Sequence, residues 1–230
     1  MFEKLADLGF DSNEKAQVLE NFIRLFCDYN KKVNLVSKKE INVLFEKHIY
    51  DSLAFNLFYQ KYCNASIKLI DIGTGGGFPS LPIAMFFNSV DVTAVDSTLK
   101  KIKFIEFASK EIGLTNIHPL CKRAEELAFN AEFDVGVSRA MAQMRIILEY
   151  IIPYIKVGGY FVAYKSIKAE EEIQNAQNAL KVLNSEIIDK IEYSLPIKEE
   201  NKRVLIVVRK NKLTNNMYPR KNGLIVKKPL

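Results

Sequence analysis

The sequence of 230 residues contains no tryptophan and few of the residues that bind metals or form disulfides. Its three cysteines, Cys27, Cys63 and Cys121, are odd in number and lack C-x-x-C spacing. This excludes a disulfide framework and a cysteine zinc site, and it predicts reduced thiols in a cytoplasmic protein. His48 and His118 are the only histidines, too few and too far apart to indicate a metal centre. We therefore expect no bound metal.

Long apolar runs are also missing. No stretch approaches the ~20 residues that a membrane-spanning helix needs. The amino terminus carries acids where a secretory signal would be basic and then apolar, so no membrane segment is expected. With 48% hydrophobic residues, the chain can bury a full core as one domain with a small appendage. No exposed heptad pattern indicates a dimer, and a monomer is expected.

Acidic residues are absent from the carboxyl-terminal segment 201–230, which holds nine lysines and arginines. The whole chain has a net charge of +6, so the residues before this segment are slightly acidic as a group. A basic segment on such a body favours a polyanionic partner, whose phosphates it would contact. A solvated tail in a lysine-rich protein would give the same composition.

Residues 1–64 are predicted to form an amphipathic helical cap. A helix over residues 11–30 begins with a capping-box pattern and carries one apolar stripe. Ser37 and Glu40 form a second capping-box pattern, which opens a helix with His48 on its apolar face. At that spacing His48 is either a half-buried packing residue or a functional one.

From residue 65 to residue 210, short apolar runs alternate with helical periodicity. Strands are expected at 66–72, 91–96, 116–121, 133–139, 159–165, 186–195 and 202–209. Helices are expected near 79–87, 98–112, 142–155 and 168–183. Gly158 and Gly159 are expected to form the turn before the fifth strand. This order predicts an α/β fold with a seven-stranded, mostly parallel sheet and an antiparallel last strand, the plan of class I methyltransferases. Residues 211–230 are expected to be an extended basic tail.

A glycine-rich turn follows the first expected strand. The apolar run ends at Asp71, and Gly73, Gly75 and Gly77 then precede a helix that starts near Pro79. Glycines let the backbone approach a ligand closely, and the free N–H groups of a helix start point toward it. We interpret this turn as a cofactor site of the nucleotide type rather than as a purely structural turn.

Two kinds of cofactor fit a glycine turn. The dehydrogenase fingerprint is G-x-G-x-x-G, whereas Gly73, Gly75 and Gly77 give G-x-G-x-G. Asp96 ends the next strand, where it is placed for a ribose diol. The tighter spacing, followed by Phe78 and a proline, favours S-adenosylmethionine, which has no pyrophosphate. A nicotinamide oxidoreductase is the alternative from another enzyme class.

Polar residues follow four of the expected strands, whose carboxyl ends meet at the ligand edge of an open α/β sheet. Besides the glycine turn, these segments are Asp96-Ser97-Thr98, Arg123-Ala124-Glu125 and Ser138-Arg139. We expect an adenine to lie against Arg123-Ala124-Glu125 and the reaction centre to face Arg139. A surface ion pair is the alternative role for Arg139.

Two patterns of base-modifying methyltransferases are absent. The chain has Ser138-Arg139-Ala140-Met141 where amino-group enzymes carry (Asp/Asn)-Pro-Pro-Tyr, and no cysteine follows a proline as in carbon-5 pyrimidine enzymes. A ring nitrogen such as guanine N7 presents a lone pair and has no proton to lose. Its methylation requires in-line geometry in a dry pocket and no general base.

Several short patterns occur in order along nearly the whole chain: Asn34-Leu35, His48-x-x-Asp51-Ser52-Leu53, Asp71-Ile72-Gly73-x-Gly75-x-Gly77-Phe78-Pro79, Asp96-Ser97, Arg123-x-Glu125, Ser138-Arg139-Ala140, Lys165, Arg203-x-Leu205 and Tyr218-Pro219-Arg220-x-x-Gly223. As an ordered set they resemble the small-subunit ribosomal RNA methyltransferase G family of guanine-N7 methyltransferases, also called glucose-inhibited division protein B. Ser80 and Ile225 depart from the family pattern, which commonly has glycine and proline there.

The resemblance implies methylation of guanine 527 in the decoding-region loop of 16S rRNA, within the small ribosomal subunit or its precursor. It implies S-adenosylmethionine contacts from Gly73, Gly75, Gly77, Phe78, Asp96, Ser97, Thr98, Ala124, Glu125 and Arg139. Arg139, Asn34 and His48 are assigned positioning roles in catalysis, and RNA contacts are assigned to Arg123, Lys165, Arg203 and Arg220. A non-catalytic RNA-binding subunit on the same fold is the remaining alternative.

Overall fold

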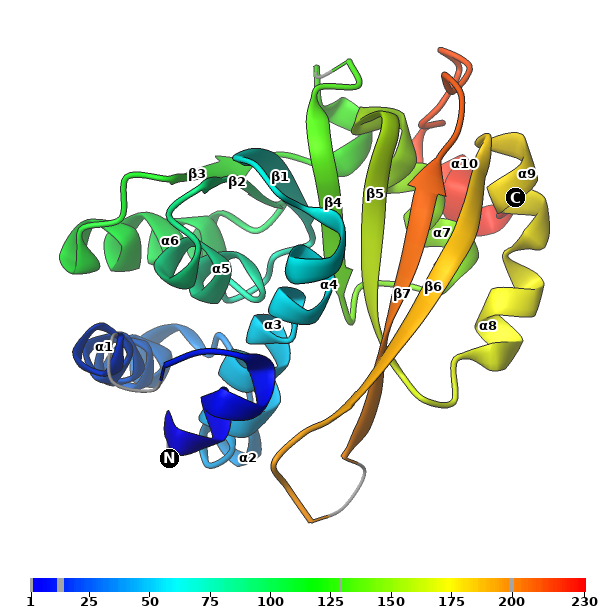
Figure 1. Cartoon of the computed structure of the whole chain (residues 1–230). Coiled ribbons are helices and arrows are strands. Elements are labelled where there is room, and N and C mark those ends of the chain that lie inside the picture. Colours follow the sequence, from blue (N-terminus) through cyan, green and yellow to red (C-terminus); the bar gives the residue numbers. More distant parts are fainter. Residues whose placement is uncertain (1, 12–14, 129, 199–200) are drawn as a thin grey trace.

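The structure is a computed structural model that describes residues 2–11, 15–128, 130–198 and 201–230. Its centre is a seven-stranded sheet in the order β3-β2-β1-β4-β5-β7-β6 (Figure 1). The strands are β1 (Ile67–Ile72), β2 (Val90–Asp96), β3 (Ile117–Cys121), β4 (Phe133–Arg139), β5 (Ile155–Ser166), β6 (Ser185–Ser194) and β7 (Lys202–Lys210). β7 pairs antiparallel with both β5 and β6, while the other described strand pairs are parallel, which confirms the predicted sheet.

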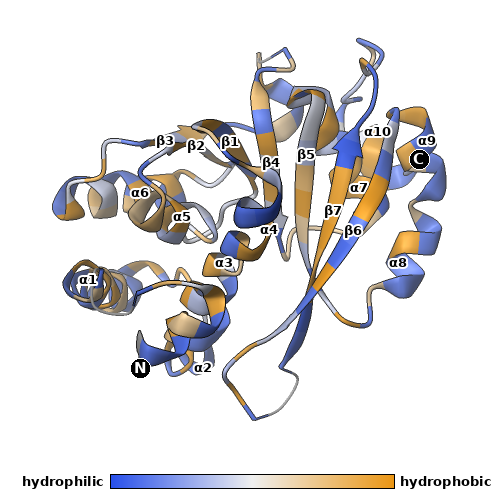
Figure 2. Cartoon of the chain, viewed as in Figure 1, coloured by the Kyte–Doolittle hydropathy of each residue, from blue (hydrophilic) through white to orange (hydrophobic). Residues whose placement is uncertain are grey.

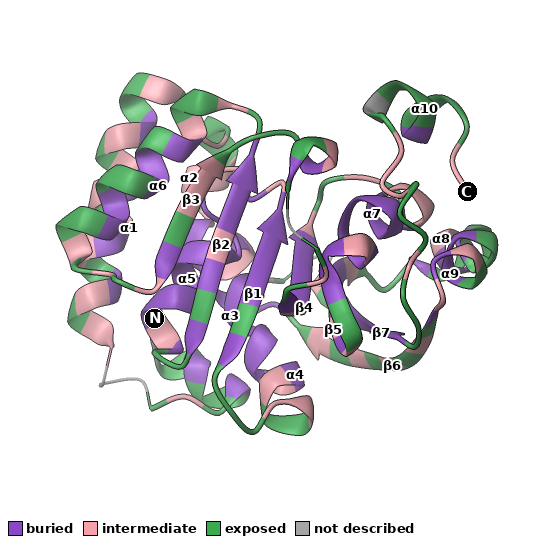
Figure 3. Cartoon of the chain, turned by 90° about the horizontal axis from the view of Figure 1, so that it is seen from above, coloured by how far each residue is buried: buried purple, intermediate pink, exposed green. Residues whose placement is uncertain are grey.

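Helices cover both faces of this sheet. On one face lie η1 (Phe2–Leu8), α1 (Ala16–Val33), α2 (Lys38–Ile41), η2 (Phe45–Tyr50), α3 (Asp51–Leu53), α4 (Phe55–Tyr62), α5 (Ser80–Phe86) and α6 (Leu99–Ile112). On the other lie η3 (Ala124–Glu126), α7 (Met144–Ile151), η4 (Ile152–Tyr154), α8 (Glu170–Asn175), α9 (Gln177–Val182) and α10 (Asn222–Lys227). Because both faces are covered, the central strands β1 and β2 are mostly buried (Figure 3). None of the described helices is long and apolar enough to cross a membrane.

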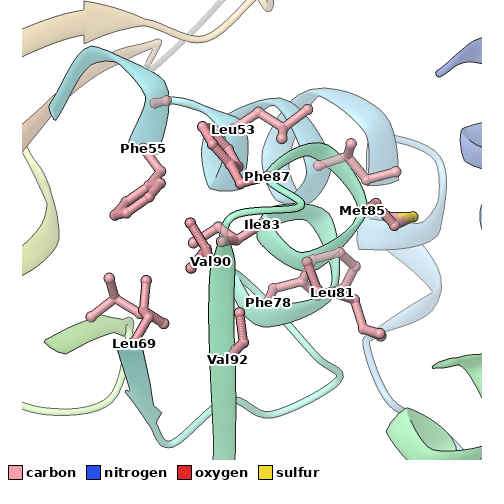
Figure 4. Close-up of a cluster of buried hydrophobic side chains, with 14 of the residues drawn as sticks. Leu53, Phe55, Leu69, Phe78, Leu81, Ile83, Met85, Phe87, Val90 and Val92 are labelled. Atoms are coloured by element: carbon pink, nitrogen blue, oxygen red, sulfur yellow. The ribbon is translucent and has the colours of Figure 1, made fainter. Parts of the chain in front are cut away.

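The amino-terminal helices share the main hydrophobic core. Figure 4 shows Leu53 and Phe55 of this region beside Leu69 of β1 and Phe87, which follows α5. The ring of Phe26 on α1 lies 5.2 Å from that of Phe104 on α6, within the range of favourable edge-to-face packing. The helical cap therefore rests directly on the sheet layer, while its division from the rest of the chain at residue 64 stays a prediction.

The edge strand β6 has one face toward the core and one face toward water. Its residues alternate between buried or half-buried and more exposed positions, and Figure 2 shows both hydrophilic and hydrophobic residues along it. Such alternation is typical of a strand with one face on the core. Charged residues such as Glu186 and Lys190 on the edge also discourage pairing with another chain.

Two local predictions are wrong. Gly158 and Gly159 lie inside β5 rather than in a turn before it, because the strand already begins at Ile155. A Cβ atom at Gly159 would lie 2.6 Å from the carbonyl oxygen of Asp134, so the glycine permits close strand contact where the β4–β5 register shifts. The helix expected to reach residue 155 accordingly ends earlier, as α7 and the single turn η4.

The two ends of the chain also differ in detail from the predictions. The first long helix begins at Ala16 rather than residue 11, and residues 12–14 of its expected capping box lie outside the described residues. The tail is not fully extended, because it contains α10, whose Ile225 is fully buried in the second core. Ile225 thus replaces the family's common proline with a side chain that anchors the tail.

The second predicted capping box is confirmed. Ser37 Oγ accepts a hydrogen bond from the backbone N–H of Glu40 at 3.3 Å, and Glu40 Oε2 accepts one from the backbone N–H of Ser37 at 3.1 Å. The helix that follows is not uniform. It passes into a π-helical segment at Phe45–Tyr50, a rare geometry that is common near functional sites, and His48 lies in this segment.

Candidate functional site

The glycine turn after β1 requires glycine for geometric reasons. Gly73, Gly75 and Gly77 have φ values of 78°, 60° and 88°, which side chains disfavour. The N–H groups of Gly73 and Thr74 donate to the carbonyl oxygen of Val95 at 2.9 and 3.0 Å, which ties the turn to the end of β2. A Cβ atom at Gly73 would lie 2.8 Å from Sδ of Met141. The turn therefore leaves no room for a side chain at its first position.

A buried carboxyl group, that of Asp71, is linked to this turn by hydrogen bonds. Asp71 is fully buried, and its Oδ2 accepts a hydrogen bond of 2.6 Å from Ser80 Oγ, which in turn accepts one of 2.9 Å from Thr74 Oγ1. Burial raises the pKa of Asp71 to about 7. Ser80 departs from the family pattern, and its hydroxyl is the hydrogen-bond donor to Asp71 Oδ2.

Asp96 joins the glycine turn to the next strand end. Its Oδ2 accepts a hydrogen bond from the N–H of Gly75 at 3.0 Å and one from Lys101 Nζ at 3.3 Å. Its Oδ1 accepts from the N–H of Thr98 at 2.8 Å. The carboxylate is thus fixed in orientation at the mouth of the turn, as a ribose-binding acid needs to be.

A cavity of about 390 Å³ opens at these strand ends, and we call it the cofactor cavity. Seven residues of the predicted site line it: Gly73, Asp96, Ser97, Thr98, Arg123, Ala124 and Glu125. Lys101, Lys122, Met141 and Tyr150 also line it, although none of them was assigned to the site from the sequence. Lys122 and Met141 follow the ends of β3 and β4, whereas Lys101 and Tyr150 come from helices α6 and α7.

Three predicted cofactor residues do not line the cofactor cavity. Gly75 donates to Asp96 rather than lining the cavity. Gly77 allows the side chain of Leu81 on α5 to pack against the turn, because a Cβ atom at residue 77 would lie 2.4 Å from Leu81. Phe78 is buried, and its ring packs 5.1 Å from that of His48. Their direct contact with a cofactor stays a prediction.

Arg139 lies at the end of β4 in a second cavity of about 1010 Å³, which adjoins the first through Ala140 and Met141. Its Nη1 donates to the carbonyl oxygen of Lys47 at 2.8 Å and to Asp51 Oδ2 at 3.1 Å. Six basic residues line this space, which we call the basic cavity: Lys47, Arg139, Lys165, Lys168, Lys202 and Arg203. Arg139 therefore faces the larger space beside the cofactor cavity and lines only that space.

His48 is held as a neutral imidazole in the basic cavity. Burial, and next the positive charge of Arg139, lower the pKa of His48 to about 4. Arg139 Nη2 donates to Nδ1 of His48 at 2.8 Å. Because a guanidinium has only donors, Nδ1 is the acceptor and the imidazole proton is assigned to Nε2. That nitrogen faces Glu40 Oε1 at 3.8 Å, beyond hydrogen-bond distance.

Asp51 and Tyr193 extend the hydrogen-bond network of Arg139 and His48. Asp51 is buried and accepts from Arg139 through Oδ2 and from the hydroxyl of Tyr193 through Oδ1 at 2.5 Å. The hydroxyl of Tyr164 donates to the carbonyl oxygen of Ser52 at 2.9 Å. Sequence reasoning assigned no role to Tyr193, since it lies on β6, far from the other members in the chain. The His48-x-x-Asp51 spacing, which places both on one helical face, was the available signal for Asp51.

The predicted RNA-binding residues are distributed differently. Lys165 lines the basic cavity, where Nζ donates to Glu172 Oε2 at 2.6 Å and to the carbonyl oxygen of Ala142 at 2.9 Å. Arg203 lines the same cavity, and exposed Arg123 lines the cofactor cavity. Lys165 is therefore engaged within the protein, as an ion-pair partner of Glu172.

Two of the residues assigned to catalysis or RNA binding line neither cavity. Arg220 donates to both carboxylate oxygens of Glu149, from Nε at 2.7 Å and from Nη2 at 2.6 Å. Its guanidinium thus fixes the tail to the buried Glu149 on α7, and an RNA contact of Arg220 stays a prediction. Asn34 is exposed, has a φ of 51°, and ends α1 through its N–H, which donates to the carbonyl oxygen of Asn30. That geometry is a helix terminus, and a catalytic role for Asn34 stays a prediction.

Comparison with solved structures shows the same fold. A SAM-dependent methyltransferase from Methanosarcina mazei matches with a TM-score of 0.54 at 19% identity, over 69% of this chain and 98% of that one. TYW2 of M. jannaschii, solved in complex with AdoMet, matches with a TM-score of 0.52 at 14% identity, over 64% and 69% of the two chains. This fold is the seven-stranded sheet predicted above.

Sequence comparison identifies the family. Residues 15–206 match the family model described as rRNA small subunit methyltransferase G. The protein of that name from Streptococcus sanguinis (strain SK36) is 40% identical over 100% of this chain and 98% of its own length. That from Streptococcus thermophilus (strain CNRZ 1066) is 41% identical over 98% of this chain and 96% of its own length. The chain therefore belongs to the rRNA small subunit methyltransferase G family, and its cofactor is S-adenosylmethionine.

Proposed function

We propose that this protein methylates N7 of a guanine in 16S rRNA, the guanine 527 of the decoding-region loop that the family resemblance implies. The observation that carries the proposal is the adjacency of two cavities. The cofactor cavity and the larger basic cavity share Ala140 and Met141 as a common wall. A methyl donor in the first space and a base in the second would meet at this wall.

The residues of the cofactor cavity fit a nucleoside with an aliphatic arm. Gly73 lines the cavity without a side chain, and a Cβ atom there would lie 2.8 Å from Met141 Sδ. Asp96 presents a carboxylate of fixed orientation for ribose hydroxyls, and Ala124 and Glu125 lie where an adenine edge would need backbone and carboxylate partners. S-adenosylmethionine supplies an electrophilic methyl group on a sulfonium sulfur.

The basic cavity fits a base that loses no proton before attack. The pKa of His48 is about 4, and hydrogen bonds from Ser37 hold the pKa of Glu40 below its usual value. Neither group accepts a proton readily at neutral pH. Guanine N7 needs no such acceptor, because its lone pair is free. The contribution of the chain is then to position the reacting groups. Arg139 is itself held by three hydrogen-bond partners, with its guanidinium 5.5 Å from the ring centre of Phe78.

The charge around this cavity suits RNA. Lys168 and Lys202 are exposed at its rim, together with the partly exposed Arg203. Phosphate contacts of this kind position a nucleic acid without reading its sequence and weaken steeply with salt. We therefore assign the rim to the RNA backbone and the interior of the cavity to the target base.

The test is methyl transfer to small ribosomal subunits isolated without this modification. The protein and labelled S-adenosylmethionine are expected to give one labelled guanine, which borohydride and aniline treatment cleaves as N7-methylguanine. Gly73→Val is the control and is expected to abolish both cofactor binding by calorimetry and labelling. Label on another base, or on a guanine resistant to the cleavage, would refute the assignment to N7.

A further inference from the structure

Among the described residues, the basic cavity contains one carboxylate that pairs with no lysine or arginine. Its three acidic residues are Glu40, Asp51 and Glu172. Asp51 accepts from Arg139 and Tyr193. Glu172 Oε2 accepts from Lys165 Nζ at 2.6 Å and from the N–H of Met144 at 3.0 Å.

Glu40 differs from these two because no lysine or arginine among the described residues pairs with it, whereas Asp51 pairs with Arg139 and Glu172 with Lys165. Both hydrogen bonds from Ser37 go to its Oε2, from the backbone N–H at 3.1 Å and from Oγ at 2.9 Å. Its Oε1 accepts no hydrogen bond from the described residues at hydrogen-bond distance, and the Glu40 side chain is 46% exposed. One oxygen is therefore anchored while the other is presented to the cavity.

The surroundings keep this carboxylate charged and oriented. Hydrogen bonding from Ser37 lowers the pKa of Glu40. On its other side lies His48, whose Nε2–H is 3.8 Å from Oε1 and has no hydrogen-bond partner. Since Arg139 donates to Nδ1 of the same ring, a chain Arg139–His48–Glu40 links the end of β4 to the carboxylate.

A carboxylate without a cationic partner is unexpected in a cavity that receives a polyanion. A carboxylate would repel the phosphates of an RNA substrate, so its presence favours a partner rich in donors. Among the four RNA bases, guanine alone presents two adjacent donors, N1–H and the N2 amino group, on its Watson–Crick edge. Adenine and cytosine each present one amino group there and uracil presents one imino group. Unpaired bases in RNA are read on these edges.

We propose that Glu40 is a specificity-determining residue, whose carboxylate accepts hydrogen bonds from N1–H and the N2 amino group of the target guanine. This inference rests on the proposed function, because it requires a guanine in the basic cavity. Binding by the Watson–Crick edge leaves N7, on the opposite edge of the purine, free to face the shared wall at Ala140 and Met141. One carboxylate would then select the base and present the correct nitrogen.

The test pairs a protein change with a base change. Small subunits are assembled from ligated 16S rRNA with either guanosine or inosine at the target position, since inosine lacks only the N2 amino group. The unmodified protein is expected to methylate guanosine about tenfold or more better than inosine in kcat/KM, the effect of one hydrogen bond to a charged group. Glu40→Gln is expected to reduce that ratio to within about threefold of one.

Two further variants separate recognition from folding. Glu46→Gln makes the same chemical change at a residue of η2 that lines neither cavity, and it is expected to keep the full ratio. Glu40→Asp retains a carboxylate and is expected to recover part of the preference. A ratio in Glu40→Gln equal to that of the unmodified protein overturns this inference alone. Absence of methylation of the guanosine subunits by the unmodified protein overturns the proposed function and this inference with it.

Discussion

Arg139 at the end of β4 donates a hydrogen bond of 2.8 Å to Nδ1 of His48, which lies 91 positions earlier in the chain. This bond joins the central sheet to the π-helical segment of the amino-terminal cap. It forms only while His48 is neutral, because a protonated imidazole has no acceptor. The two residues therefore couple the geometry of the basic cavity to the charge of one buried ring.

The first prediction concerns stability in mild acid. The pKa of His48 is about 4 in the folded protein and 6.5 in its ordinary state. Between these values the unfolded chain binds a proton that the folded chain does not, so the free energy of unfolding falls as pH decreases from 6.5 to 4. Relative to His48→Asn, the protein is expected to lose up to about 3 kcal/mol over this range.

Urea unfolding at pH 7 and at pH 4.5 measures this difference, because carboxylates that titrate in both proteins cancel. His118→Asn is the matched control, since His118 is exposed and bound only to Asp91. It is expected to retain the slope of the unmodified protein. Parallel stability curves for the unmodified protein and His48→Asn would contradict a neutral buried imidazole.

Much of this architecture could be predicted locally. An apolar run followed by glycines marked the end of β1, and polar residues marked the end of β4. The strand ends placed Gly73 and Asp96 in one cavity. The contacts of Arg139 could not be predicted in this way, since its partners lie on helices whose packing no local pattern encodes. The same is true of Arg220: its charge indicated a nucleic acid, but only the folded chain brings the buried Glu149 beside it.

The second prediction concerns the glycine turn. Gly73→Ala would place a Cβ atom 2.8 Å from Met141 Sδ and force a positive φ, so S-adenosylmethionine is expected to bind about tenfold more weakly or worse. Gly75→Ala is the matched control. It forces the same strain, but the nearest atom to its Cβ would be 3.9 Å away. Calorimetric titration should rank Gly73→Ala well below Gly75→Ala, and equal affinities would show that only strain matters.

The third prediction concerns Lys210, which is 1% exposed. Its Nζ donates to the carbonyl oxygens of Ile152 at 3.0 Å and Ile155 at 2.8 Å. Lys210→Met leaves these buried groups without that donor, so the free energy of unfolding at pH 7 is expected to fall by about 1–3 kcal/mol.

The pH dependence of the same pair of proteins gives an independent check. Burial lowers the pKa of Lys210 to about 8, against 10.5 in the unfolded chain. Between these values the unfolded chain binds the extra proton, so stability rises with pH there. The advantage of the unmodified protein over Lys210→Met is expected to grow between pH 8 and pH 10 by up to about 3 kcal/mol. An advantage that shrinks over this range would exclude a depressed pKa.

The fourth prediction separates folding from RNA binding at Arg220. Its guanidinium forms a two-pronged pair with Glu149, which is fully buried. Arg220→Met would leave that carboxylate without its cation, so the free energy of unfolding is expected to fall by about 3–5 kcal/mol. Arg220→Lys keeps the positive charge but cannot form both hydrogen bonds to Glu149, so a smaller decrease in the free energy of unfolding is expected. Trypsin should then cut the tail near Lys221 and Lys227 faster in both variants.

RNA binding distinguishes this role from a phosphate contact. Removing a phosphate contact lowers the slope of log K against log salt by about one unit. Under conditions where Arg220→Met remains folded, that slope is expected to equal the unmodified protein's, because the guanidinium is committed to Glu149. Lys202→Met at the rim of the basic cavity is the contrasting variant and is expected to lower the slope. A reduced slope in Arg220→Met would return this residue to the RNA-binding surface.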